Sequence, residues 1–403
     1  MNEFLIKPKI HFGADALNAL RDLPGRSAFL VTDQAMVKLG MAEQVTRLLQ
    51  QQQVRCRQYD SIASDPDIAA IVSGMKMMDD DYPELIIALG GGSVIDAAKA
   101  VMYTLWHCRQ ERRRPRPCFV AIPTTSGTGS EVTSFSVIKA RSEKLVLVDE
   151  FMLPDVAILD PQLVASVPPV ITADTGMDVL CHALEAYVSR RASDFSDALA
   201  EKVVQLVFHH LLPCYQQGSD MLAREKMHNA SCMAGMAFTN ASLGVTHSMA
   251  HALGGMFGVP HGRANALLMH EAIAFNADLD GECATPAAHK YAALARLLAL
   301  PAASAREGVN SLLVAIATLK QEMNMPASLH AAGLDEHRFQ VCLNEMAHQA
   351  LHDGCTPTNP REVSLADLES MLRRAYHGAA GNDPSSSLRT LRDNVQGEGI
   401  RRY

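Results

Sequence analysis

Two pairs of polar residues stand at helical spacing inside apolar stretches of the chain. Asp178 and His182 are four residues apart, and so are His247 and His251. Residues four apart project from the same face of a helix. His261 follows shortly afterwards, at a predicted helix start. One carboxylate and up to three imidazoles form a donor set that suits Fe(II), Zn(II), Co(II) or Mn(II), which makes a metal site the first hypothesis.

A lone histidine in an apolar helix is more often a hydrogen-bonded core residue than a ligand. Three histidines this close together, accompanied by an aspartate and a histidine on one helix face, favour the metal site over that interpretation. His247 and His251 share a predicted helix face, so the spacing leaves open whether one or both of them would bind the ion.

Two loops rich in glycine, serine and threonine follow predicted buried strands. GGGS (90–93) follows the strand 85–89 and opens a helix, and PTTSGTGSE (123–131) follows the strand 119–122. Glycine lets a backbone approach a ligand closely, and a helix N-terminus presents unpaired N–H groups to phosphate. The spacing is not the common GxGxxG fingerprint, and a tight turn would explain the first loop alone. Together, at the carboxyl ends of strands in one sheet, the two loops predict a phosphate-binding crevice.

Asp33 ends another predicted strand, 27–32, and allows two interpretations. Its carboxylate could accept hydrogen bonds from a ribose and repel a 2′-phosphate, which favours NAD over NADP. It could equally be the N-cap of the helix that follows. The sequence does not decide between them.

The elements that must position these residues divide the chain in two. Up to about residue 170, buried apolar strands alternate with helices, which predicts an α/β domain with a parallel sheet covered on both faces. Beyond that point strand-like alternation nearly disappears, and nine helices are predicted at 174–190, 194–212, 221–239, 243–257, 262–276, 286–299, 304–323, 335–349 and 364–376. We expect an α/β domain at 1–172, an all-α domain at 173–378 and a polar, mobile tail at 379–403.

Composition argues against several functional classes. A net charge of -8 gives no reason to expect binding to nucleic acid or to an anionic membrane, and the one dense basic run, 112–116, is interpreted as a solvated loop. No apolar run approaches the ~18 residues of a membrane helix. Nine scattered cysteines without a CxxC pair, and no signal peptide, favour a reduced, cytoplasmic protein.

The segments described above resemble the iron-containing (group III) alcohol dehydrogenase family. The resemblance is carried by GGGSVIDAAK (90–99), PTTSGTGSEVT (123–133), GMDVLCHALEAYVS (176–189) and HSMAHALGGMFGVPHGRANALLMH (247–270), and it extends to about residue 377. It implies a Rossmann-like N-terminal domain and a helical C-terminal domain, with the active site in the cleft between them.

The resemblance also implies a role for each matching residue. One divalent metal, Fe(II) first and Zn(II) as the alternative, is expected on four ligands: Asp178, His182, His247 and His261. His251 is expected to be a non-ligand catalytic residue beside the nicotinamide and the substrate. The implied cofactor is NAD, and its expected contacts are Asp33, Gly91, Gly92, Ser93, Asp96, Thr124, Thr125, Ser130 and Lys144.

The implied function is a metal-dependent, NAD(H)-linked alcohol dehydrogenase that interconverts a small primary aliphatic alcohol and its aldehyde, such as 1-propanol and propanal or ethanol and acetaldehyde. Segments 166–180, 191–202 and 226–238 look most like the 1-propanol dehydrogenases of propanediol breakdown, which implies association with a bacterial microcompartment. We also expect a homodimer or larger homo-oligomer. The alternatives are a glycerol or diol dehydrogenase, a hydroxyacid–oxoacid transhydrogenase and, from a different class, a metal-binding scaffold subunit.

Overall fold

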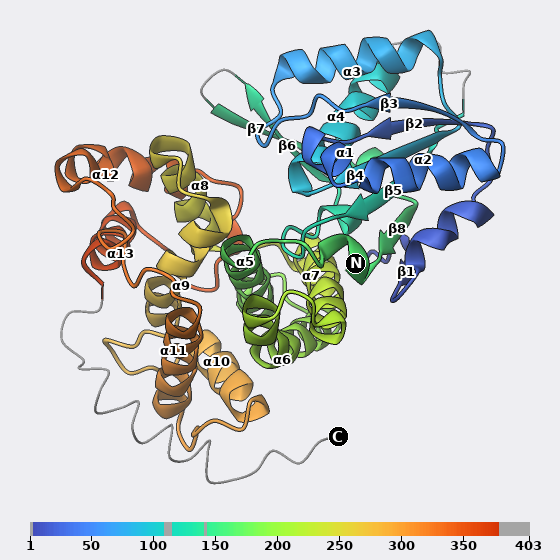
Figure 1. The fold of residues 1–403 in the computed structure, drawn as a ribbon. Helices are drawn as coiled ribbons and strands as arrows, with labels where there is room; N and C mark the ends of the chain where they lie inside the picture. The colour runs from blue at the N-terminus through green and yellow to red at the C-terminus, as the bar shows by residue number, and fades with distance from the viewer. Residues whose placement is uncertain (1–2, 109–114, 141–142, 379–403) are drawn as a thin grey trace.

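The first half of the molecule is built on a parallel sheet. The computed structural model describes residues 3–108, 115–140 and 143–378 (Figure 1). Its sheet has six strands in the order β1-β8-β5-β4-β2-β3, and every neighbouring pair is parallel. The strands are β1 (Lys9–Phe12), β2 (Ser27–Val31), β3 (Arg55–Tyr59), β4 (Leu85–Gly90), β5 (Cys118–Pro123) and β8 (Val156–Leu159).

The sheet is covered by helices on both faces, as predicted. Along β4, Ile86 and Ala88 belong to the core formed with α3 (Ile68–Asp80) and α4 (Gly92–Cys108). The alternate residues of the strand, among them Ile87, belong to the core formed with α2 (Met41–Gln51) on the opposite face. Side chains alternate between the faces of a strand, so burial on both sides explains why the strand is apolar throughout.

Two features of this half were not predicted. The edge strand β1 is only four residues long and pairs with β8. The β segments of 134–148 form a separate antiparallel hairpin of β6 (Phe135–Ala140) and β7 (Glu143–Val148). The hairpin is not part of the parallel sheet.

The strand order places a switch point between β2 and β4. The chain passes from β2 to β3 on one side, and then returns to β4, β5 and β8 on the other side of β2. In open parallel sheets, ligands bind outside the carboxyl ends of the strands at such a point. Asp33 follows β2, and the GGGS loop follows β4, so both lie at this point.

The second half consists of helices, and each of the nine predicted after residue 174 is present among the described residues. They are α5 (Pro169–Val188), α6 (Asp194–Gln216), α7 (Met221–Ala241), α8 (Val245–Phe257), α9 (His261–Asn276), α10 (Pro286–Leu297), α11 (Ala305–Glu322), α12 (Glu336–Leu351) and α13 (Leu365–His377). Helix α5 begins earlier than predicted, at Pro169, because proline is well suited to the first position of a helix. The expected domain boundary after residue 172 therefore falls in its first turn.

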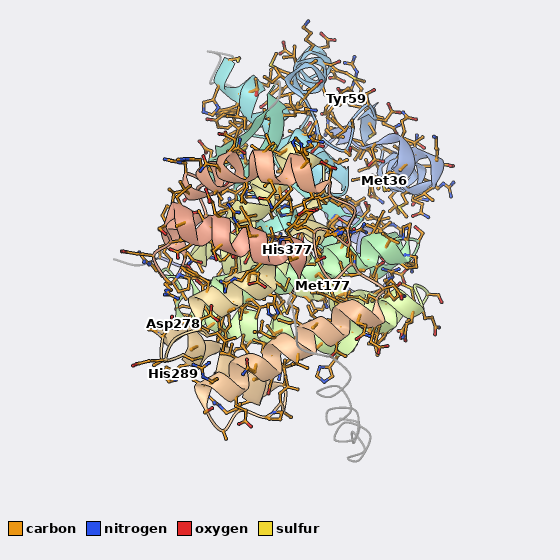
Figure 2. All side chains as sticks on the ribbon, turned by 90° about the vertical axis from the view of Figure 1, so that its left-hand side faces the viewer. Met36, Tyr59, Met177, Asp278, His289 and His377 are labelled. Carbon is orange, nitrogen blue, oxygen red and sulfur yellow. The ribbon has the colours of Figure 1, made fainter. Side chains whose placement is uncertain are left out.

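Helix α5 is the central helix of this half. It packs against α6, α7 and α9, and Met177 near its middle is fully buried in the interior (Figure 2). Apart from one polar stripe, α5 is apolar around its circumference, which is typical of a helix in a protein core. Within the described residues, no helix combines the length and apolarity needed to cross a bilayer.

The interpretation of the basic run as a solvated loop is wrong for its last residue. Arg116 donates hydrogen bonds to the backbone oxygens of Phe151 (3.1 Å) and Leu153 (2.7 Å), and its guanidinium pairs with Asp155. It joins the chain segments that enter β5 and β8. Residues 112–114 and the predicted tail 379–403 lie outside the described part of the chain.

Candidate metal and dinucleotide site

Four polar residues form a stripe along the otherwise apolar α5. Asp174, Asp178, His182 and Glu185 are all buried, at spacings of four, four and three residues. These spacings place them on one face of the helix. The stripe faces the starts of α8 and α9, which carry the other candidate ligands.

The four predicted metal ligands converge. One carboxylate oxygen, Oδ1 of Asp178, lies 3.8 Å from Nε2 of His182, 3.7 Å from Nε2 of His247 and 3.5 Å from Nε2 of His261. Metal bonds of about 2.1 Å in a tetrahedron place neighbouring ligand atoms about 3.4 Å apart. The four ligand atoms all lie within 4.8 Å of one another, so they are grouped closely enough to be drawn onto one ion.

Local sequence explains how the helices come so close. Gly262 follows His261 at the start of α9, and a Cβ at this position would lie 2.1 Å from the backbone oxygen of Asp174. Only glycine permits this approach of α9 to α5. The next residue, Arg263, then pairs with both carboxylate oxygens of Asp174, each at 3.0 Å. The contact fixes His261 beside Asp178.

The electrostatics of the site suit a cation. Burial lowers the pKa of His182 to about 4, so its imidazole is neutral near pH 7 and keeps a lone pair for a metal. Burial raises the pKa of Asp178, but His182, His261 and His247 outweigh burial and hold it well below its ordinary value. The carboxylate is therefore ionised.

Two neighbouring clusters also combine metal-ligating atoms, but both contain a short hydrogen bond. Nδ1 of His247 is 2.6 Å from Glu185, and Nδ1 of His251 is 2.8 Å from Asp353. Two atoms bound to one ion are separated by about 3.0 Å even at a right angle, given bonds of about 2.1 Å. These clusters are therefore hydrogen-bonded pairs. The arrangement groups His247, and not His251, with Asp178, a choice that spacing left open.

Three residues of this site were not predicted. Asn265 donates a hydrogen bond from Nδ2 to Asp178 at 2.7 Å, and Nδ2 lies 3.1 Å from Nε2 of His247. Glu185 and Asp353 bind the histidines as described above. Asn265 and Glu185 stand at helical spacing from predicted ligands and could have been found from that signal. Asp353 is 102 residues from His251, and no local pattern points to it.

The two glycine-rich loops meet, as predicted. The ends of β4 and β5 are paired at Gly90 and Pro123, and the Thr124 N–H donates to the Gly90 oxygen at 3.0 Å. A Cβ on Gly92 would lie 2.7 Å from the methyl carbon of Thr128. Helix α4 begins at Gly92, so the N–H groups of its first turn, which have no partner within the helix, lie beside both loops. The missing side chains leave a cradle that fits the phosphates of a dinucleotide.

The remaining predicted cofactor residues differ in how they are placed. A Cβ added to Gly91 would lie 3.5 Å from the side chain of Thr125, and Ser93 donates a hydrogen bond to the backbone oxygen of Ser64. Asp33 caps α1 (Gln34–Lys38), accepting from the N–H of Met36 at 2.9 Å. Lys144 lies on β7, and its side chain is outside the described part of the structure.

Asp96 and Ser130 belong to a buried network whose centre, Lys99, was not predicted. Ser130 donates to Asp96 at 2.5 Å, and the Lys99 ammonium donates to Ser130 and Thr133, each at 3.0 Å. Lys99 is fully buried, and burial lowers its pKa to about 8. The network joins α4 to the end of the second loop.

The candidate metal ligands and the loops lie next to one another. Gly127, in the second loop, packs on α5, where a Cβ added to it would lie 2.8 Å from the Cβ of Thr175. Helix α7 packs on the end of that loop, where a Cβ on Gly129 would lie 2.7 Å from the Cα of Gly235. In Figure 1, α5 and α7 are the helices of the second half that lie nearest the sheet. A dinucleotide on the loops would therefore reach toward the four converging side chains.

Comparisons with known proteins agree with this arrangement. The family model of iron-containing alcohol dehydrogenases matches residues 7–161, and the model of the C-terminal part of the Fe-containing alcohol dehydrogenase family matches residues 172–376. The 1-propanol dehydrogenase PduQ of Salmonella typhimurium is 41% identical, over 92% of this chain and 99% of that protein. An NADPH-dependent butanol dehydrogenase of Clostridium saccharobutylicum is 36% identical, over 94% of this chain and 99% of its own.

The fold has a solved counterpart. A 1,3-propanediol oxidoreductase superimposes with a TM-score of 0.86 at 31% identity, over 93% of this chain and 100% of that one. The chain spans 45% of the length of an aldehyde-alcohol dehydrogenase of Streptococcus pneumoniae, to which it is 40% identical over 92% of its own length. More than nine-tenths of the chain thus matches nearly the full length of some relatives and about half the length of others. The chain belongs to the iron-containing alcohol dehydrogenase family.

Proposed function

We propose that the protein is a metal-dependent, NAD(H)-linked alcohol dehydrogenase. The observation that carries the proposal is the convergence of one carboxylate and three imidazole nitrogens, with separations of 3.5–3.8 Å from the Asp178 oxygen, beside the two glycine-rich loops. A dehydrogenase of this type must hold a cation and a nicotinamide close together. The similarity to 1-propanol and butanol dehydrogenases supports the same activity.

The proposed ligands of the cation are Asp178, His182, His247 and His261. Fe(II) is the metal that the family description favours, and nitrogen-rich donor sets also suit Zn(II). A divalent ion held there supplies a Lewis acid that lowers the pKa of the alcohol hydroxyl. The role of the protein is to fix four ligands from three helices and to exclude bulk water from their inner side, where Asp178, His182 and His247 are buried.

The proposed cofactor site is the switch point of the sheet. Gly91, Gly92 and Ser93 at the start of α4, with Thr124 and Thr125 in the second loop, would hold the pyrophosphate. Asp96, Ser130 and Lys144 complete the set proposed from the resemblance. Bound NAD supplies the acceptor for the hydride of the alcohol carbon.

Asp33 supports NAD over NADP, because its carboxylate stands at the end of β2, where a ribose binds in folds of this type. The butanol dehydrogenase relative uses NADPH, so similarity alone does not determine the nucleotide. The choice of NAD therefore rests on this one carboxylate.

His251 is the proposed proton carrier. Its Nδ1 is held by Asp353, its side chain is 36% exposed, and its ring stacks on that of His261. From this place it would accept the proton that the alcohol hydroxyl loses and pass it to solvent, a task for which imidazole is suited near neutral pH.

The proposed substrate is a small, uncharged primary aliphatic alcohol or aldehyde. Among the described residues, Arg263 stands next to a candidate ligand, and its pairing with Asp174 leaves it unavailable to an acid group of a substrate. We further propose a homo-oligomer, located in the cytoplasm or in a bacterial microcompartment. Similarity to a 1-propanol dehydrogenase supports this location.

The proposal is tested by NADH oxidation with aldehydes of two to four carbons. The chain is stripped of metal, reloaded with Fe(II) or Zn(II), and assayed with each aldehyde, and NADPH is run in parallel. We expect oxidation of NADH only after reloading, with slower use of NADPH. Absence of turnover with every aldehyde and both metals would overturn the proposal.

A further inference from the structure

Glu185 is the last residue of the polar stripe on α5, and its carboxylate is fully occupied by the start of α8. It accepts hydrogen bonds from the Gly244 N–H at 3.0 Å, the Thr246 N–H at 2.7 Å and Nδ1 of His247 at 2.6 Å. Its exposed fraction is 4%. All three donors come from four consecutive residues, and the N–H of Val245 among them donates to Asn359 at 3.3 Å. One carboxylate thus binds three of the donors in the first turn of α8.

The first consequence is a cap supplied by another helix. The first N–H groups of a helix have no partner within the helix, and negative charge is favourable at that end. The N-cap of α8 is Gly244, which has no side chain to do this. A Cβ there would lie 3.0 Å from Oε1 of Glu185 and 2.8 Å from Asn359, so glycine is needed to admit the carboxylate.

The second consequence concerns the tautomer of His247. An ionised carboxylate only accepts hydrogen bonds, so Nδ1 of His247 must carry a proton. The other ring nitrogen, Nε2, lies 3.7 Å from Asp178 and is therefore the atom of His247 left to bind an ion. A carboxylate that orients a histidine in this way also increases its basicity as a ligand.

The third consequence is charge balance. Asp174 is neutralised by Arg263, which leaves Asp178 and Glu185 as the two carboxylates beside the converging histidines. Buried charge is costly unless it is compensated. Two negative charges match one divalent cation.

We propose that Glu185 is a positioning residue of the metal centre, which holds His247 in the orientation and tautomer that bind a divalent ion. The inference rests on the proposed function, because it takes His247 as a ligand. Glu185 does not touch the ion in this arrangement. It acts through His247.

The test compares Glu185→Gln with wild type by metal binding, not by turnover. The Gln side chain has the same shape and can still accept from the Thr246 N–H. Its amide NH₂ group would then take the place of the oxygen that accepts from the Gly244 N–H and from His247. Hydrogen-bond donors would face donors there, so these two bonds are lost. We expect about a tenfold to hundredfold weaker affinity for Co(II), used as a spectroscopic substitute, and a changed visible absorption spectrum.

Cys181→Ala is the matched control, because Cys181 is the other side chain beside Nδ1 of His247, with its sulfur 3.7 Å away. It should bind Co(II) as wild type does. Equal affinity and an equal spectrum for Glu185→Gln would overturn the inference. A wild-type protein that binds no Co(II) would instead overturn the proposed function.

A second measurement covers the case in which the variant does not fold. In Co(II)-loaded wild type, proton NMR resolves the shifted signals of the ligand imidazole N–H groups. The His247 Nδ1 proton, enclosed by Glu185, should exchange with solvent most slowly among them. Fast exchange of all of these signals would contradict the hydrogen bond and the inference with it.

Discussion

The two halves of the molecule form their parts of the site by different means. In the sheet half, the proposed phosphate site combines short polar side chains with main-chain N–H groups, which glycines and a helix start offer where two parallel strands end. In the helical half, the candidate metal ligands are side chains placed at spacings of one helical turn. They are held by further side chains such as Glu185 and Asp353. The first arrangement depends on absent side chains, and the second on side chains that are present.

This difference predicts opposite sensitivities to substitution. A loop that binds through its backbone is damaged by adding atoms, because a new Cβ occupies the space of the ligand. A metal centre is damaged by removing atoms, since each missing ligand leaves the charge of the ion uncompensated. The substitutions below test the comparison in order of expected effect.

Removal of one proposed ligand is expected to have the largest effect. His261→Ala takes away a ligand at the first position of α9, where the side chain is 36% exposed and a truncation leaves the core intact. Losing several kcal/mol of Lewis-acid stabilisation corresponds to a fall in kcat of about a thousandfold. Metal content and kcat are measured together, with His209→Ala as the control at an exposed histidine that contacts no ligand. A variant with full metal content and activity would remove His261 from the site.

Addition of one carbon to a loop should follow. In Gly92→Ala the new Cβ would meet the side chain of Thr128, so the two loops must separate. We expect NADH to bind about tenfold more weakly, because the loss of even one or two phosphate contacts costs more than 1 kcal/mol. Metal content should not change. Titration of NADH fluorescence measures the affinity.

Two further variants make that result specific. Thr128→Ala, combined with Gly92→Ala, removes the clashing atoms and should restore part of the affinity. Gly255→Ala adds a Cβ on α8 with no neighbour within 4 Å, and it should bind NADH normally. If Gly92→Ala binds NADH as tightly as Gly255→Ala, the loop is not the phosphate site.

The same contrast explains how far the sequence predicts the molecule. Signals carried by one element were sufficient: the Asp178 and His182 pair, the apolar strands and the nine helices all follow from local spacing. Contacts between residues far apart in the chain could not be predicted in this way. The short strand β1 was missed because its partner, β8, is far away in the chain, and its own residues Lys9 and His11 are polar.

The choice between His247 and His251 shows the same limit. Both stand on one face of α8, and only the approach of Asp178, Glu185 and Asp353 from other elements distinguishes them. Lys99 was likewise missed, since the groups that accept its hydrogen bonds lie 31 to 36 residues away. Which helix faces meet depends on packing of the whole core, and one sequence does not contain that information in local form.

Loss of the partner of His251 should have a smaller effect. Burial raises the pKa of Asp353, but the hydrogen bond from His251 outweighs burial and lowers the pKa to about 2, so the carboxylate is ionised at any working pH. Asp353→Ala frees the ring to rotate, and we expect kcat to fall about tenfold, a part of the 10²–10⁴ that a positioned acid or base contributes. KM and metal content should change little, because Asp353 is bonded to His251 and is not one of the four proposed metal ligands.

The His251→Ala background provides the control for that result. If Asp353 acts through His251, then Asp353→Ala should add almost nothing to the defect of His251→Ala. Additive effects of the two substitutions on kcat would show that Asp353 acts independently, for example through the Cys355 N–H that it also holds at 2.8 Å.

The smallest expected effect is at Asp33, where both interpretations of the sequence are compatible with the structure. The cap of α1 uses one carboxylate oxygen, Oδ1, on the N–H of Met36. Capping alone would leave stability unchanged in Asp33→Asn, since asparagine caps as well as aspartate, and Asp33→Gly would cost only a few tenths of a kcal/mol.

A role of Asp33 at the ribose predicts a different result. Both variants remove a negative charge that repels a 2′-phosphate, so the ratio of kcat/KM for NADPH to that for NADH should rise about tenfold in each. An unchanged ratio in both variants would leave Asp33 as a cap only, and the preference for NAD would then have to come from another part of the crevice.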